Sequence, residues 1–288
     1  MNRFVTPDGL GLAWEEEGAG LPLLCLPGLT RNGSDFDELA AALGGRHRLI
    51  RLTFRGRGAS DRDPDWSRYS VPVEAADVVA FLDHLGLEKV TIVGTSRGAI
   101  VAMFLAATAK ARLAGALLND IGPELDPEGL GAIMTYLGIA PRAKTLDEGA
   151  DALARRMGAR FPGLSREKWL SLAGRWFDAT PDGLALNYDP RIRDAFEATA
   201  DHPPVDLWPL FEALAGLPVA LVHGANSDLL SRETVARMRA RLPDMIVAEV
   251  PDRGHVPFLD EPEALAALEA LVTRVEDGGT TGGATGGA

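Results

Sequence analysis

Apolar residues along this chain follow two alternating patterns. Short runs of neighbouring apolar residues are separated by longer stretches in which apolar residues recur every three or four positions. The short runs predict β-strands and the longer stretches predict helices. The predicted strands span residues 12–16, 23–26, 49–53, 90–93, 113–118, 219–222 and 245–250, and the predicted helices span residues 36–43, 73–85, 99–109, 233–242 and 262–275. This order predicts an α/β fold with a mostly parallel central sheet flanked by helices.

The alternation stops between the strands predicted at 113–118 and 219–222. Residues from about 121 to 204 show helical spacing without convincing strands, and this gap is too long for a simple crossover. The sequence therefore predicts a core formed by residues 1–120 and 205–276, with a helical cap inserted at 121–204. Residues 277–288 are rich in glycine and threonine and lack an apolar anchor, so we expect a disordered tail.

Charge and cysteine content limit the classes of partner. The formal net charge of the 288 residues is −12, whereas a nucleic-acid-binding protein needs clustered Lys and Arg. The single cysteine, Cys25, lies in an apolar run, which favours an inert buried thiol. The N-terminal residues lack the apolar core of a signal peptide, and no run reaches the roughly 18 apolar residues of a membrane span. We expect a cytoplasmic protein without a membrane or nucleic-acid partner; its oligomeric state is open.

The pentapeptide at residues 94–98 (Gly-Thr-Ser-Arg-Gly) matches the pattern of a nucleophile elbow. It lies between a predicted strand and a predicted buried helix. In such an elbow the serine occupies a tight turn, and small residues two positions before and after it avoid clashes between strand and helix. The helix N-terminus favours the negative charge that develops during acyl transfer. Ser96 is therefore the candidate nucleophile.

A serine nucleophile needs a base and an acid that orients the base. His255 follows the last predicted strand, in a loop that we expect at the same edge of the sheet as Ser96. Asp228 follows the penultimate strand and is our preferred acid. Asp120, at the end of the strand predicted at 113–118, is the main rival, because some folds of this type place the acid there. Asp252 is a weaker rival because it is close in sequence to His255.

An oxyanion hole needs two convergent backbone N–H donors. One candidate is Arg97, the residue after the nucleophile. The other is Leu29, in the loop after the strand predicted at 23–26, where Gly28 permits a turn. Arg31 in the same loop is as compatible with the pocket wall as with the surface.

These pieces together resemble the α/β-hydrolase fold family. The matching segments are 26–29, 54–61, 94–98, 223–228 and 254–255, which occur in the expected order between residue 4 and about residue 275. The resemblance implies that the Arg-Gly-Arg-Gly-Ala-Ser stretch at 55–60 is a structural turn, to which we assign no chemistry. One departure is Pro27-Gly28 before the oxyanion donor, where many relatives have His-Gly.

The serine at position 96 favours acyl transfer, since related dehalogenases and epoxide hydrolases use aspartate at the elbow. We expect an esterase or lactonase that acts on a small, fairly apolar molecule and water through an acyl-enzyme, without metal or cofactor. The alternatives are a hydrolase of carbon–carbon bonds in ring-cleavage products and a non-catalytic ligand sensor. The aromatic residues of the cap are more typical of its core than of a pocket wall: Tyr136, Trp169, Trp176, Phe177 and Tyr188.

Overall fold

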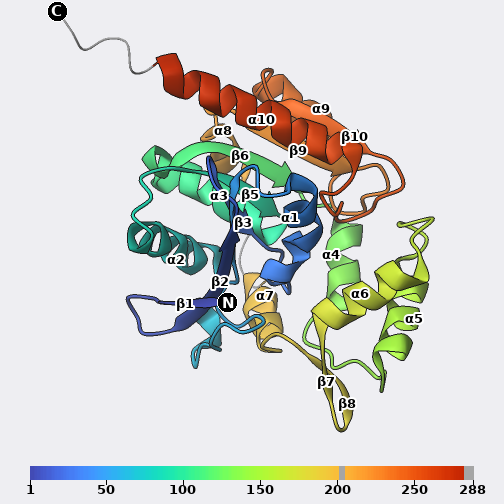
Figure 1. Cartoon of the computed structure of the whole chain (residues 1–288). Helices are drawn as coiled ribbons and strands as arrows, with labels where there is room; N and C mark the ends of the chain where they lie inside the picture. The colour runs from blue at the N-terminus through green and yellow to red at the C-terminus, as the bar shows by residue number, and fades with distance from the viewer. Residues whose placement is uncertain (201–204, 282–288) are drawn as a thin grey trace, which may run out of the picture.

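The computed structural model describes residues 1–200 and 205–281, whose centre is an eight-stranded sheet (Figure 1). The strand order is β1-β2-β4-β3-β5-β6-β9-β10. Pairing is parallel from β4 to β10, and β2 runs antiparallel to both of its neighbours. The strands are β1 (Asn2–Val5), β2 (Gly11–Glu17), β3 (Pro22–Leu26), β4 (Arg48–Leu52), β5 (Val90–Thr95), β6 (Leu113–Asn119), β9 (Val219–Gly224) and β10 (Ile246–Val250). This arrangement confirms the α/β class and the mostly parallel sheet; β1 was not predicted.

Both faces of the sheet are covered, which explains why the central strands are almost continuously apolar. In β3, Leu24 and Leu26 belong to one buried cluster and Leu23 and Cys25 to the other. Successive side chains of a strand point to opposite faces, so a buried strand needs apolar residues at every position. The strand residues of the two clusters therefore form the two halves of a core divided by the sheet.

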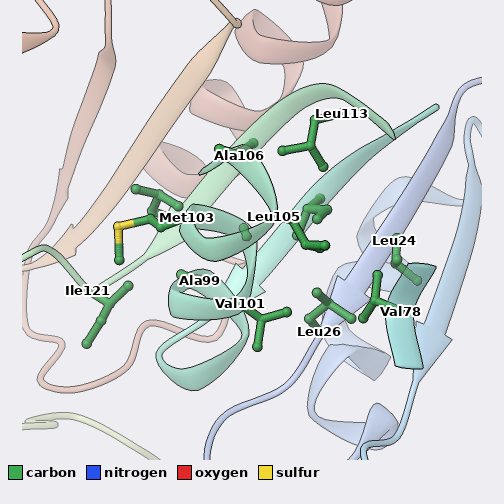
Figure 2. Close-up of a cluster of buried hydrophobic side chains, with 14 of the residues drawn as sticks. Leu24, Leu26, Val78, Ala99, Val101, Met103, Leu105, Ala106, Leu113 and Ile121 are labelled. Carbon is green, nitrogen blue, oxygen red and sulfur yellow. The ribbon is translucent and has the colours of Figure 1, made fainter. Parts of the chain in front are cut away.

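The helices are distributed over these two faces. Helices α2, α3, α8 and α9 supply residues to the cluster with Leu24, and α1 and α10 supply the cluster with Leu23. Figure 2 shows the packing of α3 against the sheet, with Val101 and Leu105 of α3 among the buried side chains. The helices are α1 (Asp37–Leu43), α2 (Val71–His84), α3 (Arg97–Thr108), α8 (Trp208–Glu212), α9 (Arg232–Arg241) and α10 (Pro262–Thr281), with short 3-10 turns at Gly33–Phe36, Trp66–Arg68 and Lys110–Arg112.

Between β6 and α8 the chain forms a separate helical layer with its own apolar cluster, which includes Phe161, Trp169 and Trp176. Its elements are α4 (Pro127–Met134), α5 (Leu146–Met157), α6 (Arg166–Trp176), β7 (Phe177–Thr180), β8 (Gly183–Leu186) and α7 (Ile192–Ala200). The antiparallel pair β7 and β8 corrects the expectation that 121–204 lacks strands. These strands have four residues each, too few for a clear alternating pattern.

Helix α10 continues to Thr281 and so includes residues 277–281, which we had expected in the tail. Its described buried positions end at Val275. The rest of the expected tail, residues 282–288, lies outside the described residues. Within 1–200 and 205–281, no helix is both long and apolar enough to cross a membrane.

Candidate active site

Ser96 lies at the sharp junction between β5 and α3. Its backbone angles are φ 49° and ψ −110°, a conformation that L-residues rarely adopt and that costs of order 1–3 kcal/mol. The flanking glycines make this junction possible. A Cβ on Gly98 would lie 2.0 Å from the Leu26 carbonyl oxygen, and one on Gly94 would lie 2.6 Å from the Ala99 nitrogen. The packing of strand, turn and helix therefore excludes any larger residue at either position.

A chain of two hydrogen bonds joins Ser96 to a histidine and a carboxylate. Ser96 Oγ lies 2.9 Å from His255 Nε2. The other ring nitrogen, Nδ1, lies 2.9 Å from Asp120 Oδ2. With the proton of the neutral imidazole on Nδ1, Nε2 is free to accept the Ser96 proton. This geometry is that of a serine–histidine–aspartate triad.

The carboxylate of Asp120 is held on several sides. Asp120 follows β6 directly, has a positive φ of 55° and is fully buried. The Gly224 N–H donates to Oδ1 at 2.8 Å, and the Ser227 hydroxyl donates to Oδ2 at 2.6 Å. These bonds stabilise an ionised carboxylate and fix its orientation toward His255.

The structure corrects the assignment of Asp228 as the orienting acid. The Asp228 carboxylate forms an ion pair with Arg160 at 2.9 Å, and it is Asp120 that bonds to the imidazole. The loop after β9 packs against α4 so closely that a Cβ on Gly129 would lie 2.5 Å from the Asp228 carbonyl oxygen. This contact turns Asp228 toward the helical layer. Asp252, the weaker rival, is exposed.

The two backbone groups expected at the oxyanion hole come from segments that meet beside Ser96. A Cβ on Gly28 would lie 3.8 Å from the Ser96 Cβ, so the loop after β3 passes next to the nucleophile. Leu29 lines the same cavity as Ser96. Arg97 is the first residue of α3, where backbone N–H groups have no intrahelical acceptor. The assignment of Leu29 and Arg97 as oxyanion donors stays a prediction.

A buried ion network connects these two segments. Arg57 is fully buried, and it donates to the Leu29 carbonyl at 2.9 Å and pairs with Glu74 at 2.9 Å. Glu74 also pairs with Arg97 at 2.6 Å. Burial raises the pKa of Glu74, but the positive charges of Arg97 and Arg57 outweigh it and hold the pKa below its ordinary value. Arg57 belongs to the turn at 55–60, to which the sequence assigned no chemistry.

Ser96 and His255 line a cavity of about 160 Å³ between the sheet and the helical layer. Trp169 and Trp176 both belong to the apolar cluster of the cap, and Trp176 also lines the cavity, as does Tyr136. Arg31 lines it too, together with three arginines that the sequence did not single out: Arg156, Arg160 and Arg175. Within the described ranges, no group of three or more His, Cys, Asp or Glu side chains is arranged to hold a metal ion.

The chain is similar in sequence and in structure to known hydrolases. The chain is 39% identical to the 3-hydroxybutyrate-oligomer hydrolase of Cupriavidus necator over 268 residues, which are 90% of this chain and 91% of that protein. It is 29% identical to the N-formylmaleamate deformylase of Pseudomonas putida, over 84% of this chain and 85% of that protein. The crystal structure of an α/β hydrolase from Novosphingobium aromaticivorans superposes with a TM-score of 0.88 at 41% identity, covering 95% of this chain and 97% of that one.

The family profile described as "Alpha/beta hydrolase family" matches residues 23–268. This range runs from β3, through the Ser96 junction, to α10. Profile, relatives and fold agree: the chain belongs to the α/β hydrolase family.

Proposed function

We propose that this hydrolase cleaves carboxylic esters of small hydroxy acids, such as short 3-hydroxybutyrate oligomers, through an acyl-enzyme on Ser96. The observation that carries the proposal is the hydrogen-bonded chain from Ser96 through His255 to Asp120, beside a cavity. Aligned nucleophile, base and orienting acid are the requirements of acyl transfer.

The residues of the site provide the groups needed for both halves of the reaction, acylation of Ser96 and its hydrolysis. His255 Nε2 takes the Ser96 proton while Ser96 Oγ forms a bond to the ester carbonyl carbon. The N–H groups of Leu29 and Arg97 stabilise the resulting oxyanion. The ester C–O bond then breaks, and the leaving alcohol takes the proton from His255. A water molecule, deprotonated by His255, then forms a bond to the acyl carbon. The bond between this carbon and Ser96 Oγ breaks, the acid leaves, and Ser96 Oγ takes the proton back from His255.

The relatives support the choice of hydroxy-acid ester. The relative at 39% identity is named for hydrolysis of 3-hydroxybutyrate oligomers, whose units are joined by esters. Other relatives are named for 2-(acetamidomethylene)succinate and N-formylmaleamate, which also carry carboxylates. A cavity of about 160 Å³ favours a small substrate. Its arginines favour an acidic molecule over the fairly apolar one expected from the sequence.

The test is hydrolysis of the linear 3-hydroxybutyrate dimer by the purified protein and by Ser96→Ala. We expect the wild type to release 3-hydroxybutyrate and the variant to lose at least about 10⁴-fold in kcat. A fluorophosphonate probe should label the wild type at Ser96. Absence of labelling, or faster turnover of a ring-cleavage dienone than of any ester, would overturn the proposal. Ligand binding without any turnover would indicate a sensor.

A further inference from the structure

The cavity beside Ser96 differs in charge from the chain as a whole. Four arginines and two aspartates line it, although the net charge of the chain is −12. A concave site with an excess of one charge attracts ligands of the opposite sign. The arginines at this cavity are therefore candidates for substrate recognition.

Two of these arginines are neutralised within the protein. Arg160 forms an ion pair with Asp228 at 2.9 Å. Arg175 forms an ion pair with Glu38. Burial of the Arg175 guanidinium lowers its pKa, but the nearby carboxylates, Glu38 above all, outweigh this effect and raise the pKa above its ordinary value. Both charges hold the helical layer against neighbouring elements, so neither needs a ligand.

Arg31 is only weakly compensated. Its guanidinium carbon stacks 3.4 Å from the Trp176 ring centroid, and the nearest carboxylate, on Asp35, is 3.9 Å away. Asp35 also accepts a hydrogen bond from Trp176 at 2.9 Å. Burial raises the pKa of Asp35 above its ordinary value. Trp176 and Asp35 therefore hold the Arg31 guanidinium in place and leave its charge largely uncompensated.

Arg156 has no acidic partner among residues 1–200 and 205–281. It lies in the last turn of α5, lines the cavity, and stacks 4.5 Å from the Tyr136 ring centroid. Arg156 remains open to solvent on one side. Partial desolvation lowers the pKa of its guanidinium, and the positive charge of Arg31 lowers that pKa further. Two arginines at one cavity thus repel each other, and an anion between them would relieve this repulsion.

We propose that Arg156 and Arg31 form a subsite that binds the free carboxylate of the substrate. This inference rests on the proposed function and deepens it. Guanidinium groups bind carboxylates through paired, charge-assisted hydrogen bonds, which fix orientation as well as affinity. Arg31 lies three residues after Gly28, whose backbone passes beside Ser96, so the subsite adjoins the nucleophile.

The chemistry of the oligomer determines which ester this subsite selects. A linear 3-hydroxybutyrate oligomer has one free carboxylate, on its last unit, and that unit is the alcohol side of the terminal ester. A carboxylate held by Arg156 and Arg31 therefore presents the terminal ester to Ser96. The enzyme would remove single units from the carboxyl end.

The test compares the free-acid dimer with the same dimer methylated at its carboxylate. Chromatography of the products measures the cleavage of the internal ester in each. We expect the wild type to prefer the free acid. Arg156→Gln should lower the ratio of kcat/KM values (free acid over methylated dimer) by about 10- to 100-fold, the range for a lost charged hydrogen bond, mainly through KM. Arg156→Lys should restore part of the ratio. Arg155→Gln is the matched control, because Arg155 is the neighbouring arginine but does not line the cavity, and it should leave the ratio unchanged.

An unchanged ratio in Arg156→Gln, or an equal loss in Arg155→Gln, would overturn the subsite. If the wild type cleaves neither dimer, the proposed function fails, and the subsite is tested without catalysis. Calorimetric titration with 3-hydroxybutyrate should then show binding to Ser96→Ala and at least about tenfold weaker binding when Arg156→Gln is added. No binding to Ser96→Ala, or equal binding to both variants, would refute the subsite.

Discussion

Replacing Asp120 by asparagine changes one atom beside His255, and the surrounding hydrogen bonds determine where that atom lies. The Gly224 N–H donates to Oδ1 at 2.8 Å, so this position must remain an oxygen. The new amide nitrogen therefore replaces Oδ2, which faces Ser227 and His255 Nδ1. Because the amide NH₂ only donates, Nδ1 must accept and Nε2 must carry the ring proton. In that tautomer His255 cannot take the proton of Ser96.

We expect Asp120→Asn to lower kcat for p-nitrophenyl acetate by about 10³- to 10⁴-fold, since the nucleophile loses its base while the oxyanion donors remain. This loss corresponds to about 4–5.5 kcal/mol of transition-state stabilisation. Steady-state rates at saturating ester give the loss directly. Thermal unfolding of the same sample separates lost chemistry from lost folding.

Asp228→Asn is the matched control, because it makes the same change on the loop after β9. It removes the ion pair with Arg160, whose side chain is partly exposed. Such a pair contributes about 0–1 kcal/mol to stability. Because Asp228 is not part of the hydrogen-bond chain from Ser96 to Asp120, we expect less than a tenfold change in kcat. The assignment of Asp120 would be refuted if Asp228→Asn lost as much activity as Asp120→Asn. It would also be refuted if folded Asp120→Asn kept more than a tenth of wild-type kcat.

Three further predictions concern stability and reactivity. Gly98→Ala places its Cβ against the Leu26 carbonyl, so urea unfolding should show a loss of about 3 kcal/mol or more; an unchanged midpoint would contradict the packing at the elbow. Burial raises the pKa of Asp8, but hydrogen bonds and the charge of Arg55 outweigh it and lower the pKa to about 2. The stabilisation is complete above the ordinary pKa and is lost as pH falls through about 2, so Asp8→Asn should cost about 1–2 kcal/mol at pH 7 and only a small fraction of that at about pH 2; a loss independent of pH would argue against this linkage. Burial raises the pKa of the Cys25 thiol, so a disulfide reagent should modify it only in the unfolded protein, and rapid labelling of the native chain would be the contrary result.

The central sheet could be predicted because burial on both faces leaves a strong local signal. Strand β3 is apolar along most of its length, and the helix after β5 is apolar on nearly every face. Elements with little burial leave a weaker signal. In β1 only Phe4 is buried, and β7 is largely exposed, so neither stands out from loop sequence.

The candidate site was predictable only where local sequence determines position. Ser96 is specified by the strand, the two glycines and the helix around it. The order serine–acid–histidine is satisfied by Asp120 as well as by Asp228, so chain order cannot choose between them. The choice depends on the loop after β9, which packs on α4 and turns Asp228 toward Arg160. The available signal was the position of Asp120 at the end of β6, the strand beside β5.

The turn at 55–60 has a structural role that bears on the proposed oxyanion hole. Arg57 and Glu74 are buried charges, and removing one partner of such a pair leaves the other uncompensated at a cost of about 3–5 kcal/mol. Arg57 holds Leu29, and Glu74 holds Arg97. The two segments proposed to supply the oxyanion donors are therefore fixed relative to each other before substrate binds. Donors fixed in advance need no reorganisation when negative charge develops, and that is how an oxyanion hole accelerates acyl transfer.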